Sequence, residues 1–424
     1  MVKSIALYGN KSMLKSFFKF GITTRQGIVN IILVANAFVW YYGVIFFLQN
    51  IIGPISQNGV LLIPALFAWS LHFAGIIISA LIGAILARGK MNRVHLILIW
   101  MLIGVVSSII PIIANLTVSL NVAIISLLFG AALGFGMPNC MGYFTGHTSV
   151  ENRGRFGGII ILFSGIGSFL LAITATGNSI TYVVILSLWR GVGLLIFLIA
   201  KPSDENAKET NLTRLSYKSL LGQRSFVLYL VPWLMFCLVN YLSAPVQYQL
   251  LGKTNMNFWI AIGNVVMAAF AFVGGFMVDY IGRKRMAITG FVLLGLGYSV
   301  IGLYPENNPA WYFYTIANGT AWGILFVIFV VTIWGDLSYS HNSDKYYALG
   351  MLPFFVSKFL QPVIGDSIAG NISPYALFSF TAFFLFLAVL PLVYAPETLP
   401  EKQMKDRELK GYIEKAQRVK EKYS

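Results

Sequence analysis

The stretch from Gly275 to Arg285, GFMVDYIGRKR, is the dense charge cluster inside the second half of the chain, and long apolar segments flank it on both sides. Three consecutive cations between two membrane-length segments indicate a short turn outside the hydrocarbon, because lipid does not accept them. Its glycines permit close helix approach and a tight turn, and Asp279 is placed to pair with the arginines or with a neighbouring helix terminus. The stretch therefore predicts a cytoplasmic turn between two membrane spans.

The composition excludes most soluble functions. Of 424 residues, 57% are hydrophobic and 11% are charged, and the mean hydropathy is +0.75. A soluble protein this apolar could not cover its surface, so we expect a multi-pass membrane protein. The net charge of +15 comes from cations confined to short connections and the two tails, so no nucleic-acid partner is expected.

Residues for catalysis and for metal binding are scattered. Cys140 and Cys237 both lie inside apolar segments, and the four histidines show no paired spacing that would hold zinc. The sequence has no Walker loop and no Ser/His/Asp arrangement. We therefore expect no enzyme activity, no metal and no cofactor.

Twelve apolar segments each approach the roughly 20 residues that a bilayer core demands. The sequence predicts them near 28–50, 60–87, 94–114, 119–144, 157–177, 180–200, 226–250, 257–280, 286–304, 310–336, 349–371 and 374–395. Alternate connections carry nearly all of the loop cations, as expected when both termini lie in the cytoplasm. The fold class is therefore an all-α membrane protein of the cell membrane, expected to act as a monomer in the lipid bilayer.

The polar stretch after the sixth span divides the chain into two six-helix halves. The expected domains are a cytoplasmic arm at 1–25, a first half at 26–200, a linker at 201–225, a second half at 226–395 and a charged cytoplasmic tail at 396–424.

An internal repeat supports these two pseudo-symmetric halves. Gly83 and Gly275 each stand four residues before the inner end of their helix, and Glu151 and Asp344 each precede a glycine by six residues. The copies are unequal, because Ala87 occupies the place that Asp279 has in the second half. This puts a gating contact of the first half in doubt.

The pattern G-x-x-x-D-x-x-G-[RK]-[RK] at 275–284 resembles the signature loop of the major facilitator superfamily of transporters. The turn from Glu151 to Gly154 is similar to the acid-x-Arg-Gly turn of many members, and Pro396, Glu397 and Thr398 resemble a motif of sugar and organic-ion porters. The resemblance covers roughly 26–396 and implies transport by alternating access. It implies an inner gate formed by Gly275, Asp279, Gly282, Arg283, Lys284, Arg285, Glu151 and Arg153.

Intramembrane ionisable residues are candidates for transport, because charge in hydrocarbon is costly. Lys358 would anchor an anionic substrate or act as a gating charge; the alternative is a structural pair with an acid. His72 and Asp366 are candidate coupling groups for H+ or Na+, although a neutral buried histidine and an ordinary helix-end acid are the plainer interpretations. Arg190, which follows Trp189, is interpreted as structural.

The resemblance implies that the first, fourth, seventh and tenth spans line the cavity, and amides and aromatic rings on these spans can hold a polar organic solute by hydrogen bonds and stacking. They are also common contacts between membrane helices, each contributing about 0.6 to 2 kcal/mol. With Lys358, the candidate substrate-binding residues are Asn36, Trp40, Tyr41, Asn240, Tyr241, Gln247, Asn318, Trp322 and Gln361.

The predicted function is secondary active or facilitative transport of a small polar organic solute, sugar-like or anionic. One alternative is a proton-coupled drug exporter. Against this alternative, Ser126 stands where drug exporters of the major facilitator superfamily usually have an arginine, and the fifth span lacks the Gly-Pro pair of those exporters. A second alternative is a membrane sensor that keeps the fold without transport.

Overall fold

The computed structural model describes residues 24–56, 62–87, 92–174, 178–202, 215–338 and 343–399. Helices joined by short turns account for nearly all of these ranges, and no strand occurs within them. The N-terminal arm up to residue 23, the middle of the linker at 203–214 and the tail from residue 400 lie outside the described residues.

Twelve helical segments are long and apolar enough to cross a membrane, and they coincide with the twelve predicted spans. The predicted fold class is therefore confirmed. The first six are α2 (Thr24–Ser56), α3 (Leu62–Leu86), α4 (Arg93–Ile113), α5 (Ser119–Gly146), α6 (Arg153–Thr174) and α7 (Ser179–Ile199).

The second six begin after a short linker helix, α8 (Tyr217–Leu221). Spans seven and eight share the label α9 and are separated by a kink at Gly252, and spans ten to twelve are each interrupted. The elements are α9 (Arg224–Ile281), α10 (Arg283–Leu303), α11 (Asn308–Phe326), η2 (Val327–Thr332), α12 (Ile333–Leu337), α13 (Ser343–Gly350), α14 (Leu352–Asn371), α15 (Pro374–Leu387) and α16 (Val389–Tyr394).

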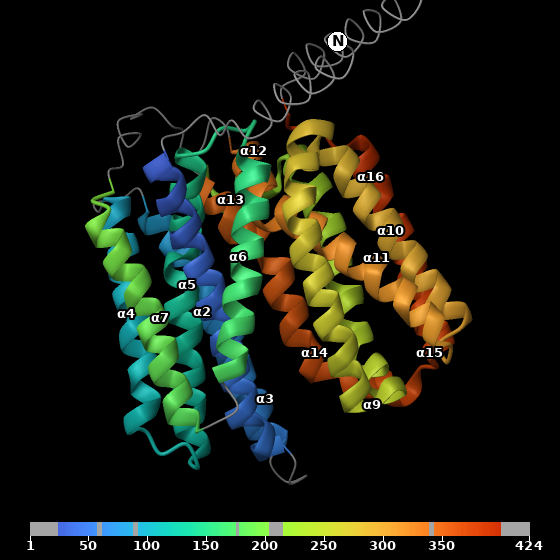
Figure 1. Cartoon of the computed structure of the whole chain (residues 1–424), viewed down its shortest axis with the longest axis horizontal. Helices are drawn as coiled ribbons and strands as arrows, with labels where there is room; N and C mark the ends of the chain where they lie inside the picture. The colour runs from blue at the N-terminus through green and yellow to red at the C-terminus, as the bar shows by residue number, and fades with distance from the viewer. Residues whose placement is uncertain are drawn as a thin grey trace, which may run out of the picture.

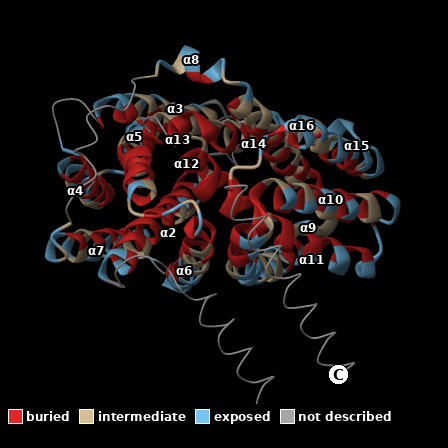
Figure 2. Ribbon diagram, turned by 90° about the horizontal axis from the view of Figure 1, so that it is seen from above, coloured by how far each residue is buried: buried red, intermediate tan, exposed pale blue. Residues whose placement is uncertain are grey.

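The two halves stand side by side, with α2 to α7 in one group and α9 to α11 and α14 to α16 in the other, while α12 and α13 lie where the groups meet (Figure 1 and Figure 2). Buried residues gather where the groups meet, and exposed residues cover the outer helices α4, α7, α10 and α15 (Figure 2). Many exposed side chains are large and apolar; Phe169, for example, is 66% exposed and Val265 71%. This surface is the lipid-facing belt of a membrane protein.

Short polar side chains mark where several spans begin. The Asn92 side chain accepts a hydrogen bond from the Val94 amide at 3.0 Å, and the Asn178 side chain accepts one from Ile180 at 2.9 Å. Such caps satisfy amides that have no partner inside the helix.

Two glycines have positive φ where the chain changes direction. Gly252, with φ of 73°, separates the spans Arg224–Gly252 and Asn255–Ile281 within α9, and Gly282, with φ of 118°, separates α9 from α10. A residue with a Cβ is strained in this region. Gly282 of the Gly275–Arg285 stretch therefore forms the predicted turn between spans eight and nine.

Span ten contains a turn of π-helix, η2, between α11 and α12. Its widened backbone is stabilised by side chains: the Tyr347 hydroxyl donates to the Val331 carbonyl, and the Trp334 indole donates to the Phe329 carbonyl. Such turns are rare and frequently lie at functional sites.

The halves make their closest backbone approach between α6 and α9. A Cβ placed on Gly275 would lie 2.5 Å from the Gly154 carbonyl oxygen, so only glycine fits. This contact lies near the end of the bundle that holds Ser149–Asn152, Gly282 and Ser338. We call it the basic end, because arginines are concentrated there.

Candidate functional site

At the basic end, Asp279 on α9 caps the first turn of α6 in the other half. Its carboxylate accepts hydrogen bonds from the Gly154 and Arg155 amides, each at 2.8 Å, and pairs with the Arg155 side chain at 3.1 Å. A carboxylate at a helix N-terminus interacts favourably with the helix dipole and with amides that lack partners. The acid of the signature stretch thus links the two halves directly.

Asp336 on α12 binds two further arginines at the basic end. It accepts a hydrogen bond from Arg153 of α6 and one from Arg283 Nε at 2.9 Å. Arg283 also pairs with Asp279 at 3.0 Å. The five side chains Arg155, Asp279, Arg283, Asp336 and Arg153 therefore alternate in sign, and we call them the arginine–aspartate chain.

The arginine–aspartate chain is almost entirely buried. Asp279 is 1% exposed and Arg283 0%, while Asp336 is 6% exposed. The Arg283 guanidinium also donates to the Val150 carbonyl of the first half, and Arg153 donates to the Thr145 and Thr148 carbonyls at 3.2 and 3.1 Å. Each buried charge therefore has several partners, because burying an unpaired charge costs several kcal/mol of folding free energy.

Glu397 and Thr398, which follow the last helix α16, contact the start of α10 and the arginine–aspartate chain. The Glu397 carboxylate accepts from the Arg283 and Lys284 amides at 3.0 and 3.1 Å, so it caps α10. The Thr398 hydroxyl donates to Asp336 at 3.1 Å. Lys284 donates to the Val393 carbonyl at 2.6 Å.

The first half contributes a weaker copy of this arrangement. Arg93 pairs with Asp344 of α13 at 2.6 Å and lies near the Gly142 carbonyl. Ala87 supplies no acid there, as the unequal repeat predicts. Glu151, the repeat counterpart of Asp344, is exposed, and its backbone carbonyl accepts from Arg155 at 3.0 Å.

The linker helix also spans the two halves at the basic end. The Tyr217 hydroxyl donates to the Leu81 carbonyl of α3 at 2.7 Å, and its ring lies 5.4 Å from the Lys345 ammonium of α13. Lys345 donates to the Leu215 carbonyl at 2.8 Å. Burial raises the pKa of Tyr217 above its ordinary value, and the nearby Asp344 charge raises it further.

These contacts give the predicted gating residues distinct positions. Asp279, Arg283 and Arg153 belong to the arginine–aspartate chain, while Gly275 and Gly282 permit the close approaches around it. A Cβ on Gly282 would lie 2.5 Å from the Glu397 carboxylate. Arg285 and Glu151 are exposed.

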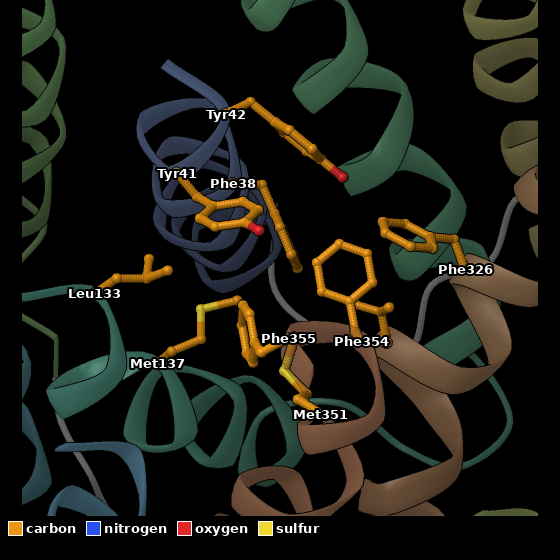
Figure 3. A pocket seen from close by; sticks show the side chains of 10 residues that line it. Phe38, Tyr41, Tyr42, Leu133, Met137, Phe326, Met351, Phe354 and Phe355 are labelled. Carbon is orange, nitrogen blue, oxygen red and sulfur yellow. The ribbon is translucent and has the colours of Figure 1, made fainter. Parts of the chain in front are cut away.

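A second candidate site lies at the centre, where both halves contribute side chains to a small pocket (Figure 3). Its open space admits about one water molecule. The lining is almost entirely aromatic, aliphatic or thioether in character. It consists of Phe38, Tyr41, Tyr42, Leu133, Met137, Phe326, Val330, Met351, Phe354 and Phe355.

Lys358 lies one helical turn beyond Phe354 and Phe355 on α14. Its ammonium is 5.0 Å from the centre of the Tyr241 ring and 3.5 Å from the Gln361 side-chain oxygen. No ion pair of Lys358 occurs among the described residues. Tyr241 in turn contacts Phe354, with ring centres 5.7 Å apart, so the cation adjoins the pocket.

Other predicted substrate-binding residues divide into two groups. Tyr41 lines the pocket, and Trp322 lies beside Tyr241 with ring centres 6.2 Å apart. Asn240 accepts a hydrogen bond from the Trp322 indole at 3.3 Å. Asn318 lies one turn before Trp322, and its buried side-chain oxygen has no hydrogen-bond partner among the described residues.

The second group faces away from the pocket. The Asn36 side chain donates to the Trp189 carbonyl at 2.7 Å, and the Trp40 indole donates to Ser108 at 2.9 Å, both inside the first half. Gln247 donates to the Tyr314 hydroxyl at 3.0 Å inside the second half. These three side chains are engaged within their own half in this conformation.

Arg190 is fully buried in the first half. It donates to the Asn36 side-chain oxygen at 2.8 Å, and its guanidinium lies 4.1 Å from the centre of the Trp100 ring and 5.2 Å from that of Trp40. This cage supports the structural interpretation of Arg190 and explains why Asn36 and Trp40 are withdrawn from the pocket.

The predicted coupling residues lie apart from the arginine–aspartate chain. His72 is fully buried between α3 and α5, with Nδ1 3.1 Å from the Ser126 carbonyl, and its Nε2 has no partner in the part of the chain that the structure describes. Asp366 lies on α14 beyond Lys358, and its side chain is outside the described residues. Within the described ranges no cluster of histidine, cysteine and acidic side chains could hold a metal.

Sequence reasoning missed Asp336 and did not assign Glu397 or the pocket phenylalanines. Asp336 ends an apolar span, and an acid in that position is usually a solvated helix end. The phenylalanines lie in spans where apolar residues are the rule. A useful signal was available for Glu397, because it belongs to the Pro-Glu-Thr motif after the last span.

Comparison with known proteins agrees with this architecture. Residues 226–419 match the sequence profile of the Major Facilitator Superfamily. The structure of the human organic anion transporter MFSD10 (TETRAN) is similar, with a TM-score of 0.67 and 13% identity, covering 87% of this chain and 99% of that one. A variant of the E. coli fucose:proton symporter FucP gives a TM-score of 0.68 at 12% identity, covering 87% and 98%.

No curated protein matches this chain by sequence. At such low identity the two structures establish the fold, while the profile match covers the half that holds Asp279, Arg283 and Lys358. The profile match thus shows that residues 226–419 are similar to the Major Facilitator Superfamily, and the two solved structures share the twelve-helix fold of the whole chain.

Proposed function

We propose that this protein carries a small organic anion across the cell membrane by alternating access. The observation that carries the proposal is the position of Lys358, next to a pocket built by both halves and without an ion pair among the described residues. A charge inside a membrane protein usually marks a substrate or ion pathway. An anion at this level would supply the counter-charge that Lys358 lacks.

In the proposed mechanism the arginine–aspartate chain is the gate at one end of the pathway. Its contacts cross between the halves at the basic end, which is the cytoplasmic end if cations stay inside. Rocking of one half against the other would break these contacts and expose the central pocket to the cytoplasm. Both termini would then be cytoplasmic, and one chain would suffice as the transporting unit.

The named neighbours support an organic solute. MFSD10 is described as an organic anion transporter and FucP as a fucose:proton symporter, so both a carboxylate and a sugar are reasonable test compounds. For this chain, Lys358 favours the anion. A lipophilic cation, the expected cargo of a drug exporter, would be repelled at this position.

Coupling to H+ or Na+ is part of the proposal. His72 is a proton-binding candidate because its buried Nε2 has no partner among the described residues. If protons drive uptake through His72, His72→Gln should abolish the dependence of transport on a pH gradient and leave exchange of labelled substrate intact. An equal response of His72→Gln and of the parent protein to the pH gradient would exclude this role.

The test is uptake by proteoliposomes containing the purified chain, screened against carboxylates, organic phosphates, sugars and lipophilic cations. We expect saturable uptake of at least one anion, lost in Lys358→Ala. Lys218→Ala is a matched control, because Lys218 is exposed on α8 and does not line the pocket. Uptake of anions that survives Lys358→Ala, or uptake of lipophilic cations alone, would refute the proposal.

A further inference from the structure

The central pocket offers few hydrogen bonds to a solute. Of its ten lining residues, Tyr41 and Tyr42 alone carry a polar side-chain group. A sugar has several hydroxyls, and each hydroxyl that is buried without a hydrogen-bond partner weakens binding. This lining therefore disfavours a sugar-like solute and favours one with an apolar body.

Aromatic rings surround the centre of the pocket on several sides. The Phe354 ring centre lies 5.6 Å from that of Phe326, 5.7 Å from that of Tyr241 and 6.3 Å from that of Tyr41. The Phe355 ring is 5.9 Å from Tyr41, and the two rings meet edge to face. Aromatic rings at these separations attract one another beyond the effect of burial, and a ring inserted into the pocket would make the same contacts.

Among the described residues, Lys358 is the cation that adjoins the pocket, and this limits the charge of the solute. Lys358 follows Met351 by seven residues on nearly the same helix line, which corresponds to about 10 Å along the axis. The pocket residues of span eleven thus lie between Lys358 and the basic end. A solute would place one anionic group at Lys358 and direct its body toward the basic end.

The pocket is nearly closed in this conformation, because its space admits about one water molecule. Met137 and Met351 line it, and unbranched thioether side chains rearrange readily. A flat, small body can enter with the least rearrangement of these residues.

From these observations we propose that the pocket takes a small organic monoanion with a flat aromatic body, such as an aromatic carboxylate. The carboxylate lies against Lys358, and the ring packs among Phe354, Phe355 and Tyr41. This inference rests on the proposed function, since it assumes that Lys358 binds the substrate anion. It narrows the substrate from polar metabolites in general to aromatic acids.

The experiment compares binding of matched ligands to the full-length purified protein by isothermal titration. Benzoate supplies ring and charge, benzamide the ring alone, and gluconate the charge with a polyol body. Butyrate supplies the charge on a short aliphatic body. We expect benzoate to bind at least tenfold more tightly than each of the other three, and to lose at least tenfold in affinity in Lys358→Met.

The variant Phe354→Leu separates the aromatic contribution from the charge. It should weaken benzoate at least fivefold and change butyrate binding by less than twofold. Phe163→Leu is the matched control, because Phe163 is 52% exposed on the lipid-facing surface and should change neither.

Each outcome distinguishes this inference from the proposed function. Gluconate or butyrate binding as tightly as benzoate, with loss in Lys358→Met, would overturn the aromatic inference and leave anion transport standing. Benzamide binding as tightly as benzoate would overturn both, because the charge would then contribute nothing. Absence of binding by all four ligands would also overturn both.

Discussion

Replacing Asp336 by asparagine should open the basic end of the transporter. The Asp336 carboxylate accepts hydrogen bonds from Arg153 of the first half and from Arg283 and Thr398 of the second half. Asparagine keeps the shape and removes the charge, so two buried guanidinium groups lose their common counter-ion. In an open conformation water would solvate both arginines, and the cost therefore falls on the closed conformation.

The magnitude follows from the burial of this network. Asp336 is 6% exposed and Arg283 is fully buried, and breaking a buried ion pair from one side costs about 3–5 kcal/mol. Both arginines keep other acceptors, among them Asp279 and backbone carbonyls, so the lower figure applies. At about 1.4 kcal/mol per factor of ten, roughly 3 kcal/mol shifts the closed-to-open ratio about 100-fold.

Double electron–electron resonance, which measures the distance between two spin labels, would detect this shift. Ser149 and Thr289 are exposed residues near the basic end in opposite halves, and labelling requires replacement of Cys140 and Cys237, both buried. We expect the distance distribution to move to longer values in the Asp336→Asn variant.

The matched control for this measurement is Glu306→Gln, which removes an exposed acid outside the arginine–aspartate chain. It should leave the distribution as it is in the parent. A distribution that is the same in Asp336→Asn and in the parent would refute the reasoning that the buried carboxylate holds this end closed.

Three further perturbations test other parts of the structure. Gly275→Ala places a Cβ 2.5 Å from a carbonyl of α6 and should lengthen the same label distance, whereas Gly370→Ala, with open space around it, should not. A double-mutant cycle of Asn36→Leu with Arg190→Met, followed by unfolding in detergent, should give a coupling of about 1.5–3 kcal/mol for their hydrogen bond, and additivity would refute it. Tyr217→Phe should lower the melting temperature by a constant amount up to about pH 9; because burial raises the folded pKa above its ordinary value near 10, the difference should fall at higher pH, and a difference that falls below pH 8 would contradict this.

The spans and the main turn follow from local chemistry, which explains why the sequence predicts them well. Lipid accepts neither unpaired backbone groups nor cations, so a long apolar run bounded by arginines forms a membrane-spanning helix. The residue types and spacing of Gly275, Asp279 and Gly282 likewise predict a close helix approach, an acid at a helix end and a tight turn. Asp279 could therefore be assigned to a helix terminus without knowledge of its partner.

The partners in the two sites depend on tertiary packing, which the sequence does not fix. Successive residues of a helix point about 100° apart, so Trp40 faces the Arg190 cage while Tyr41 faces the pocket. Residue type alone favours both equally. Asp336 is similar, because its arginines are distant in sequence: Arg283 lies 53 residues away in the same half, and Arg153 lies 183 residues away in the other half.

The π-helical turn of span ten connects the two sites mechanically. Val330 lies in this turn and lines the pocket, and Asp336 follows within two turns on α12. A π-turn holds one residue more than the α-helical turn it replaces, so its conversion to α geometry would rotate the following backbone by about 100°. Such a conversion would move the Asp336 carboxylate relative to Arg153, so contact of a solute with Val330 would be coupled through span ten to the ion pair that joins the two halves.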